Sequence, residues 1–534
     1  DVIDKTKTVM GRRLLRSNLL NPIINAEILN KRYDNVENMI DNENFLNVRN
    51  ILGNIVDIER LHRRMAVKLL DPYGFLSLDL AYKNITLLVE SIVKCKNINL
   101  TAIIPDEHII KDFNAFIQIY NTELNIDNLA GIRLHNIHKN IFQKGIYEDI
   151  DILEEKIIHY KKMIDLIREQ LSESIVQQQL EDTLQKTYKG KESKSQRAKS
   201  VYERISKTKH KLISIKYNDK EGHYLFISNS KSVFLKKALA KQTTIHIAHP
   251  NNLGLKTTES IIANTIVLKS NNTGSKITIQ TIKRISQILT SLETRMMNLS
   301  LDKFKELMNT YYTQYKSTLN KLVEFVSYID FISNIAHISI YNSYTRPIIT
   351  VDEQSYINVK GMRHPIIEKI NTQLKYIPND LHLGINAQNG ILLYGVNAVG
   401  KSSLMKSVGL NIILAQTGFF VPADEFIFSP FKHIFTRISN NDNIFKGQST
   451  FAVEMAELRS ILKRANQHSL VLGDELCCGT ETTSGLSIVT AGVLRLSSNK
   501  VNFIFATHLH KLSKMEEIVQ CDGVNNYHME TIFN

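Results

Sequence analysis

The chain has 534 residues and a net charge of +13, and this length, too great for one hydrophobic core, predicts three or four domains. The longest apolar runs, such as Ile391–Tyr394 and Phe503–Ala506, are far shorter than the roughly eighteen residues of a membrane-spanning helix, which argues against a membrane protein. No signal peptide is recognisable. The four cysteines show neither metal-ligand spacing nor a disulfide pattern, which favours a reducing intracellular compartment; they are Cys95, Cys477, Cys478 and Cys521.

Helical patterns dominate the first part of the chain. Residues 1–20 predict an amphipathic helix that ends before Pro22, since proline disfavours a helical conformation in the residue that precedes it. Residues 35–125 continue mostly in helical patterns, including Ile58–Leu70, with Asp71-Pro72 expected to break the helix. The expected apolar face of the first helix comprises Met10, Leu14, Leu15, Leu19 and Leu20.

Two long apolar stripes follow, each with members spaced alternately by three and four residues, as in a coiled-coil seam. Each predicts a helix of roughly 25 to 40 residues. Because a segment of different character separates them, we expect an antiparallel pair of long lever helices with a small domain at its tip. Two unrelated buried helices are the alternative. The first stripe is Ile146, Ile150, Leu153, Ile157, Tyr160, Ile164, Ile167 and Leu171, and the second is Ile282, Ile285, Leu289, Leu292, Met296 and Leu299.

The positive charge is concentrated in residues 184–300, which hold 22 lysines and arginines against 6 acidic residues. This segment has a net charge of +16, so the rest of the chain sums to −3. Such a concentration is typical of a surface that binds a polyanion such as DNA, and a solvated charged loop is the alternative. No motif singles out individual contacts, and the candidates are Lys207, Lys209, Lys211, Lys236, Lys237 and Lys241.

The same segment predicts a small β-rich module. Leu212–Lys216 and Tyr224–Ser228 flank a turn-forming stretch and predict a β-hairpin. Further β-branched runs follow at Thr243–Ile247, Ile261–Leu268 and Lys276–Ile279. From about residue 347, short apolar strands alternate with helices, which is typical of an α/β domain with a largely parallel sheet.

A phosphate-binding loop lies in this α/β region. Gly395 to Ser402 fits the pattern G-x-x-x-x-G-K-[ST], and its surroundings also fit, since Ile391–Tyr394 predicts a buried strand and Ser403–Leu414 a helix. Gly395 and Gly400 would let backbone N–H groups close around the phosphates of ATP, assisted by the helix N-terminus. Lys401 would bridge the β and γ phosphates, and the Ser402 hydroxyl would ligate Mg²⁺.

Two further strand ends carry candidate catalytic residues. Leu470–Glu475 is an apolar strand that ends in two acids, of which Asp474 would hold Mg²⁺ and Glu475 would polarise the attacking water as general base. Val501–Ala506 predicts a strand followed by Thr507 and His508. His508 could contact the γ-phosphate or position the water, although a lone histidine is more often a structural residue.

These motifs resemble the MutS family of DNA mismatch-repair ATPases. Asn397 in the phosphate loop is similar to the family's G-P-N-M-G-G-K-S-T, from which Val396, Ala398 and Val399 depart. The stretch from Thr436-Arg437-Ile438 to Glu454-Met455 resembles the family's interface signature, and Ala506-Thr507-His508 resembles its A-T-H strand end. The likeness covers nearly the whole chain, beginning with Thr6 to Leu15, and keeps the family's order of segments.

The resemblance implies roles that the pattern alone does not. In the family, the serine corresponding to Ser449 reaches the nucleotide of the other subunit, so the active site would need a dimer, expected here to be a homodimer. Tyr376 falls where the family has an aromatic residue that stacks on adenine. ATP and Mg²⁺ are the implied cofactors, and the nucleotide-binding set comprises Gly395, Asn397, Gly400, Lys401, Ser402, Ser403, Tyr376 and, in trans, Ser449.

Where the sequence departs from the common MutS pattern, it resembles one subgroup of the family. Asp474 to Glu481, with Cys477-Cys478, is most similar to the MutS subgroup known from giant viruses and octocoral mitochondria, in which a nuclease domain can follow the ATPase. The compartment would then be a viral factory, the cytoplasm or a mitochondrion. The family's mismatch-reading and connector domains would precede residue 1, and the chain begins with Asp1, so we expect a fragment without them. Phe304-Lys305-Glu306 has the letters of the family's mismatch wedge, but its helical setting predicts packing instead.

The sequence thus predicts a multidomain protein with four parts. These are a helical core with the first lever helix (1–183), a basic β-rich clamp (184–280), the second lever helix (281–346) and a C-terminal α/β P-loop ATPase domain (347–534). The leading hypothesis is a mismatch-repair ATPase that holds double-stranded DNA in a dimeric clamp. The alternatives are a related clamp for branched or recombination DNA and, less favoured, an SMC-like structural ATPase, which would need a serine-glycine signature where Gly447-Gln448-Ser449-Thr450 stands.

Overall fold

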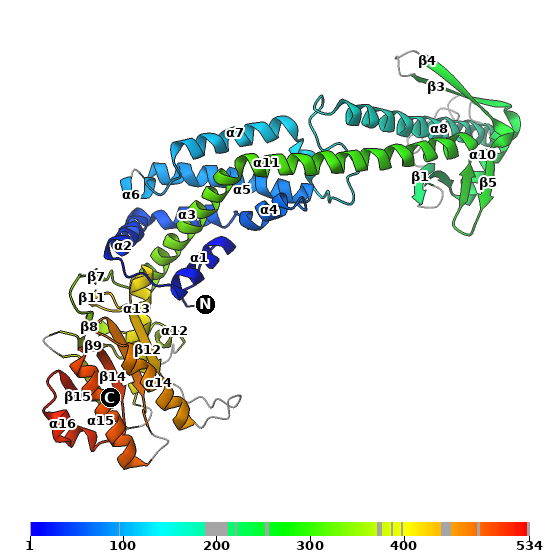
Figure 1. The fold of residues 1–534 in the computed structure, drawn as a ribbon. Helices are drawn as coiled ribbons and strands as arrows, with labels where there is room; N and C mark the ends of the chain where they lie inside the picture. Colours follow the sequence, from blue (N-terminus) through cyan, green and yellow to red (C-terminus); the bar gives the residue numbers. More distant parts are fainter. Residues whose placement is uncertain are drawn as a thin grey trace, which may run out of the picture. The chain divides into compact units, whose positions relative to one another are not determined.

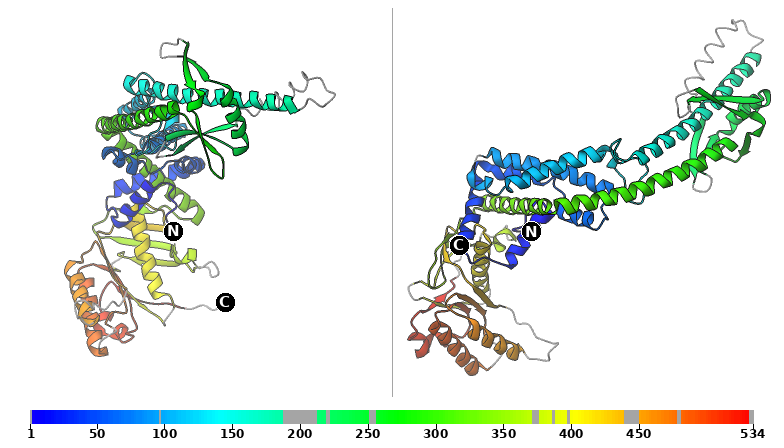
Figure 2. Two further views of the ribbon diagram at one scale, coloured as in Figure 1. Left: turned by 90° about the vertical axis from the view of Figure 1, so that its right-hand side faces the viewer. Right: turned by 45° about the horizontal axis from the view of Figure 1, so that its top comes forward.

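The computed structural model folds into two compact units (Figures 1 and 2). Unit 1 comprises Asp1–His62, Ser77–Phe113 and Tyr315–Asn534, and unit 2 comprises Arg63–Leu76 and Asn114–Gln314. The division into four domains remains a prediction. The structure describes residues 2–95, 97–186, 212–218, 222–250, 256–370, 376–385, 388–396, 399–438, 450–477 and 481–530.

Helices form the N-terminal portion, as the sequence predicts, and four of them, α4, α5, α7 and the long α11, contribute residues to both units. Among the helices described, none combines the length and the apolarity that a bilayer crossing requires. The elements are α1 (Val9–Leu20), α2 (Ala26–Ile40), η1 (Asp41–Glu43), α3 (Asn44–Leu52), α4 (Ile58–Ala66), α5 (Pro72–Lys94), α6 (Ile98–Thr101), α7 (Glu107–Glu123), η2 (Ile126–Leu129), α8 (Glu148–Lys186) and α11 (Gln280–Asn342).

The boundaries of the first helices differ from the expected ones. Helix α1 begins only at Val9, because the Thr8 hydroxyl accepts a hydrogen bond from the Gly11 amide and caps the helix. Its predicted apolar face is partly wrong, since Leu20 is 71% exposed. Pro72 does not merely break a helix but begins α5, where a proline's missing N–H costs no hydrogen bond.

The start of the chain is anchored to α11 within unit 1. The carboxylate of Asp330, fully buried on α11, accepts hydrogen bonds from the Lys7 amide at 2.9 Å, the Thr8 amide at 2.7 Å and the Thr8 hydroxyl at 2.8 Å. Burial raises the pKa of Asp330, and these three donors oppose that rise. A Cβ on Gly11 would lie 2.2 Å from the Asp330 carboxylate, so glycine is required there.

His62 gives unit 1 a measurable sensitivity to acid. Its ring is 3% exposed and bonds the Tyr82 hydroxyl at 2.8 Å, and burial lowers its pKa from 6.5 to about 3. His62 therefore binds a proton at about pH 6.5 in the unfolded chain, whereas in the folded chain it stays neutral until about pH 3. The free energy of unfolding is thus not lowered by this group above pH 6.5, and it falls as the pH drops from 6.5 toward 3. At about pH 5, the loss should be roughly 2 kcal/mol.

The pH dependence of urea-induced unfolding measures this effect. We expect His62→Gln to remove that part of the acid loss, because glutamine can bond Tyr82 without titrating. His108→Gln, a change at an exposed histidine, is the matched control and should leave the parent's pH dependence unaltered. Equal acid sensitivity in the parent and His62→Gln would show that His62 is not the group responsible.

In unit 2, helix α8 runs antiparallel to the first part of α11, side by side in both figures. Two contacts fix this direction: Lys303 lies over the Tyr147 ring just before α8, and Lys161 pairs with Glu293 at 2.7 Å. The predicted stripes face inward, except that Ile146 is 41% exposed before α8 begins. The expected length holds for α8, with 39 residues, but is wrong for α11, which has 63.

A small mixed module in unit 2 follows α8. The predicted hairpin is confirmed, with β1 (Ile213–Asn218) antiparallel to β2 (Gly222–Ile227) in a four-stranded sheet of order β1-β2-β6-β5. A separate hairpin pairs β3 and β4. Two features were not expected from the sequence, helix α10 (Asn229–Lys241) and a break between strands at η4 (Ala263–Thr265). The other strands are β3 (Thr244–Pro250), β4 (Lys256–Ile262), β5 (Val267–Ser270) and β6 (Ser275–Thr278).

The C-terminal part of unit 1 is an α/β fold with an entirely parallel sheet of order β12-β13-β14-β10-β15, as expected. Its central strands are buried on both faces: Val471 packs with α14 and α15, while Leu472 meets α13 at Gly409. The elements are β10 (Gly390–Tyr394), α13 (Lys401–Thr417), β12 (His433–Arg437), α14 (Thr450–Arg464), β13 (Ser469–Asp474), α15 (Thr482–Ser498), β14 (Asn502–Ala506), η6 (Leu512–Lys514), α16 (Glu516–Val519) and β15 (Val524–His528).

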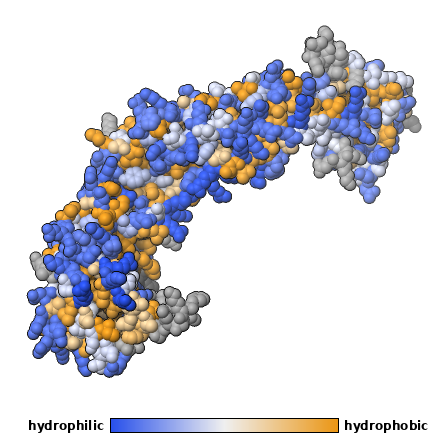
Figure 3. All heavy atoms as spheres, viewed as in Figure 1, coloured by the Kyte–Doolittle hydropathy of each residue, from blue (hydrophilic) through white to orange (hydrophobic). Residues whose placement is uncertain are grey.

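A second, mixed sheet has the order β7-β11-β8-β9, and three of its strands precede β10 in the sequence while β11 lies between α13 and β12. Strand β11 pairs in parallel with β7 and antiparallel with β8, which in turn is antiparallel to β9. Over both units, the face seen in Figure 3 intersperses hydrophilic with hydrophobic residues. The elements are β7 (Ile348–Ile349), β8 (Tyr356–Met362), α12 (Ile367–Ile370), β9 (Asn379–Leu383) and β11 (Glu425–Ser429).

Candidate functional site

The predicted phosphate loop joins strand β10 to helix α13. Gly400 precedes the helix with a φ of +107°, a left-handed conformation that favours glycine. Lys401 begins the helix and is 5% exposed, and its Nζ donates hydrogen bonds to the carbonyl oxygens of Gly395 at 2.8 Å and Val396 at 2.9 Å. The ammonium thus lies inside the loop, where loop carbonyls accept the bonds that phosphate oxygens could accept.

The two acids and the histidine meet at the same edge of the sheet. Asp474 ends β13 and pairs in register with Ala506, the last residue of β14, which in turn aligns with Leu393 of β10. Just beyond these ends, the Nε2 atom of His508 lies 3.0 Å from Oε1 of Glu475. The carboxyl ends of parallel strands are where α/β folds bind ligands, so the three predicted elements converge where that chemistry requires.

The backbone after the two acids is held in an unusual conformation. Glu475 has a φ of +52° and Cys477 a φ of +62°, both left-handed and unfavourable for residues with side chains. Two hydrogen bonds hold this turn: the Glu475 amide donates to Ala506 O at 2.9 Å, and the Cys477 amide donates to the buried Glu454 carboxylate at 2.8 Å. Such strain is common where a side chain must be aimed at a reacting group.

Glu454 is the site residue whose role sequence reasoning missed. The sequence places it only within the stretch that resembles the family's interface signature, whereas the structure shows its buried carboxylate accepting a hydrogen bond from the Cys477 amide. Nothing in the sequence pairs residue 454 with residue 477, because the contact arises only when α14 packs beside β13. The signal that could have found this role is the burial of the Glu454 carboxylate, and burial is known only from the tertiary structure.

The residues predicted to hold Mg²⁺ provide suitable ligand atoms. Oδ1 of Asp474 is buried and has no hydrogen-bond partner among the described residues, which leaves a carboxylate oxygen able to bind a cation. Ser402 and Ser403 lie half-buried in the first turn of α13. A hydroxyl and a carboxylate oxygen are hard ligands of the kind that Mg²⁺ prefers, so these residues fit the ion.

Three other nucleotide candidates are placed less fully. Tyr376 is half-buried, with its ring 6.4 Å from that of His364. Burial raises the pKa of Tyr376, and a hydrogen bond with Ser407 of α13 partly offsets the rise. Its contact with adenine remains a prediction. Asn397 and Ser449 lie outside the described residues.

The far end of α13 joins the α/β fold to the N-terminal helices of unit 1. The buried Tyr33 hydroxyl on α2 donates to Ala415 O at 2.6 Å, and the Arg32 guanidinium donates to Thr417 O at 2.8 Å. The Ile23 amide donates to Gln416 O at 2.7 Å. The helix that begins at the phosphate loop therefore ends on carbonyls bonded by the helical core.

The candidate DNA-binding lysines are divided by the structure. Lys207, Lys209 and Lys211 lie outside the described residues. Lys236, Lys237 and Lys241 lie on α10, where Lys237 pairs with Asp182 at 2.6 Å and Lys241 with Glu181 at 2.5 Å, both on α8. These two lysines thus help to hold α10 against α8, and their contact with DNA remains a prediction.

Comparison with known proteins identifies the family. The model of MutS domain III matches residues 1–336, and that of MutS domain V matches residues 391–533. The chain belongs to the MutS family. The expected subgroup is confirmed as well, because relatives from a giant virus and from octocoral mitochondria both match over the whole chain.

Three relatives illustrate the match to the MutS family. A mutS homolog of Acanthamoeba polyphaga mimivirus, named for DNA mismatch repair, is 35% identical over 100% of this chain and 48% of its own length. The mitochondrial DNA mismatch repair protein mutS homolog of Sarcophyton glaucum is 28% identical, covering 100% and 48%. The DNA mismatch repair protein MutS of Caldicellulosiruptor saccharolyticus is 29% identical, covering 99% and 54%. The chain spans about half the length of these relatives.

The Phe304-Lys305-Glu306 stretch is not a mismatch wedge. Phe304 is fully buried within helix α11, and Glu306 lies on its exposed side near Lys303, 3.7 Å away. A side chain that inserts between bases must be free to leave the protein surface. The predicted role in helix packing is therefore the one that the structure supports.

Proposed function

We propose that this chain is the ATP-hydrolysing and DNA-clamping portion of a MutS-type mismatch-repair protein. The observation that carries the proposal is the meeting of Lys401, Asp474, Glu475 and His508 at one edge of the parallel sheet. The matches to MutS domains III and V and the names of the relatives support mismatch repair over branched-DNA or SMC-like alternatives.

Each residue has a task in the proposed hydrolysis. Loop amides from Gly395 to Lys401 surround the phosphates, and Lys401 exchanges its bonds to loop carbonyls for bonds to phosphate oxygens. Ser402 and Asp474 would hold Mg²⁺, which neutralises phosphate charge when bound. Glu475 accepts a proton from the attacking water, and the hydrogen bond from His508 orients its carboxylate.

The proposed partners are double-stranded DNA and a second copy of the chain. Ser449 of one copy would complete the nucleotide site of the other, which makes hydrolysis depend on the dimer. The contacts of Arg32 and Tyr33 with the end of α13 offer a direct route from nucleotide site to helical core. We also propose that the protein acts in a reducing compartment, as its cysteines predict.

Steady-state ATP hydrolysis by this chain tests the proposal as a whole. It should be measured alone, with a matched duplex and with the same duplex carrying one mismatch. We expect Mg²⁺-dependent turnover that duplex DNA changes. If hydrolysis is the same with and without DNA, the ATPase assignment stands and the DNA-clamp assignment is wrong. If the chain neither hydrolyses nor binds ATP, both assignments are wrong.

Lys401→Met tests the phosphate loop by itself. Because it removes a charged donor to phosphate, we expect ATP affinity to fall by about 10-fold to 100-fold without loss of fold. Lys406→Met, at an exposed lysine on the same helix, is the matched control and should bind ATP like the parent. Equal ATP affinity in Lys401→Met and the parent would place the phosphates elsewhere.

A further inference from the structure

The four-stranded sheet of unit 2 has two chemically different faces. Strand alternation and register place Ile213, Leu225, Ile227 and Ile277 on one face, and all four are buried. The opposite, outer face carries an aromatic and basic set. Its members are Lys216 on β1, Tyr224 and Phe226 on β2, Lys276 on β6 and Lys269 on β5.

On the outer face, lysines cover the aromatic rings. The Lys216 ammonium lies 3.7 Å from the centroid of the Phe226 ring, and the Lys276 ammonium lies 4.5 Å from that of Tyr224. A cation over a half-exposed ring is a weaker partner than a stacked nucleobase. Tyr224 therefore presents a ring face that a base could take over, with the displaced ammonium beside it.

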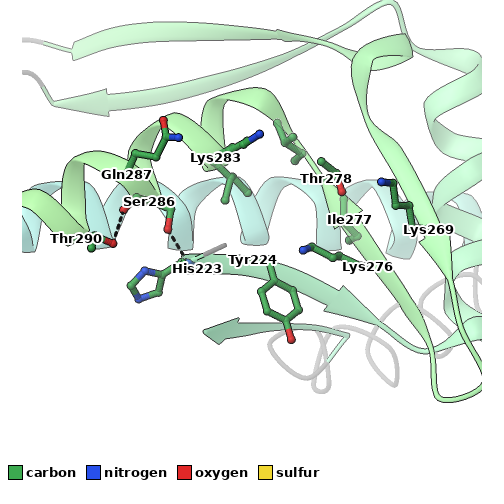
Figure 4. Close-up of a pocket in the computed structure, with 13 residues that line it drawn as sticks. His223, Tyr224, Lys269, Lys276, Ile277, Thr278, Lys283, Ser286, Gln287 and Thr290 are labelled. Atoms are coloured by element: carbon green, nitrogen blue, oxygen red, sulfur yellow. Dashed lines mark hydrogen bonds between the residues drawn. The ribbon is translucent and has the colours of Figure 1, made fainter. Parts of the chain in front are cut away.

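A cavity of about 560 Å³ lies next to Tyr224, between strands β2, β5 and β6 and the first turns of α11 (Figure 4). Lys269 and Lys276 line it from the strands and Lys283 from the helix. No carboxylate is among the thirteen residues that line it. Neither Lys269 nor Lys283 has an ion-pair partner in the described part of the chain, unlike Lys237 and Lys241 of α10.

We infer that this outer face and cavity bind single-stranded nucleic acid, with an unpaired base stacked on Tyr224. Lys276 and Lys269, which lie on the same face of the sheet as Tyr224, would contact the phosphates that flank the base. A duplex covers its bases by stacking them on each other, so it would use the lysines and leave the ring without a role. A half-exposed aromatic ring among cations is the chemistry of a strand with accessible bases.

This site deepens the proposed function and rests on it only in that the partner is a nucleic acid. It does not depend on ATP or on a dimer. The residues of this site are not among the DNA-binding lysines that the sequence suggested. The site residues on β2 and β6 come together only when the strands pair in register, which the sequence pattern does not show. Within a repair clamp, the site would favour DNA with a locally opened or unpaired strand.

The test uses the absence of tryptophan from the chain. Tyr224→Trp places a single tryptophan at the proposed stacking position, and its fluorescence should be quenched when oligothymidine is added without nucleotide. Tyr217→Trp is the matched control, since Tyr217 is exposed, lies on neighbouring β1 and pairs with His223 on the opposite face. Its fluorescence should not change.

Binding affinity gives the second measurement. Tyr224→Leu should weaken binding of oligothymidine by about ten-fold and leave duplex binding unchanged, whereas Tyr217→Leu should alter neither. Absence of quenching at saturation, or equal effects of Tyr224→Leu on single strand and duplex, would overturn the inference. Duplex binding with no effect of Tyr224→Leu on oligothymidine would overturn this inference alone, and failure to bind any DNA would overturn the clamp as well.

Discussion

Replacing Glu475 with glutamine is expected to reduce steady-state ATP hydrolysis on the order of 1000-fold and to leave ATP binding intact. Glutamine has the same size and can still accept the hydrogen bond from His508, so the strained turn should persist. It cannot take a proton from water at neutral pH. The loss therefore falls on turnover, measured as phosphate release, and not on affinity, measured with ATP itself.

Two further variants separate the chemistry from the scaffold. Glu516→Gln changes an exposed glutamate on α16 and should hydrolyse ATP like the parent. If His508 acts by orienting Glu475, then His508→Gln should slow turnover less than Glu475→Gln, and the double variant should be no slower than Glu475→Gln alone. Parent-like turnover in Glu475→Gln would refute the assignment of Glu475 as general base.

Asp330→Ala is expected to destabilise the N-terminal part of unit 1 by about 3 kcal/mol or more. The change leaves the Lys7 amide, the Thr8 amide and the Thr8 hydroxyl without their acceptor, and Thr8 is buried. It also removes the support of Thr8, which caps α1. Asp330→Asn, which retains a carbonyl acceptor but no charge, should have an intermediate effect.

Hydrogen exchange at the amides of Lys7 and Thr8 reports this anchor directly. We expect exchange about 100-fold faster in Asp330→Ala, the equivalent of nearly 3 kcal/mol of local stability. Asp302→Ala, at an exposed position on the same helix, is the control and should exchange like the parent. Unchanged protection in Asp330→Ala would mean that other contacts hold the segment.

Most of the candidate nucleotide site could be predicted from the sequence alone. Local chemistry explains this: the pattern from Gly395 to Ser402 needs only neighbouring residues, and Asp474 and His508 each follow a short apolar strand. Parallel strands that alternate with helices must align their carboxyl ends, so three separate motifs could be assigned to one edge. The family models confirm the predicted family, and the structure confirms the predicted parallel sheet.

The seams of α8 and α11 could likewise be predicted, because a buried stripe repeats every three or four residues. The length of α11 could not, since its later turns are buried on several sides and carry no single stripe, as the burial of Phe331, Ile332 and Ile335 shows. Helix α10 was missed because its lysines and alanines lack a strong apolar period. The start of α1 depended on one side-chain cap, which competes locally with an otherwise helical pattern.

Tertiary structure alone decided the contacts between residues distant in sequence. The bond from the Cys477 amide to Glu454, the anchor of Lys7 and Thr8 on Asp330, and the pairing of Lys237 and Lys241 with α8 cannot be inferred from local patterns. The outer face around Tyr224 also exists only through strand register. The sequence by itself determined which residues can bind ATP and which elements carry them, because these depend on neighbours along the chain. Which charged groups remain available to a ligand was decided by packing, because a charge is available only if no other part of the fold has already paired it.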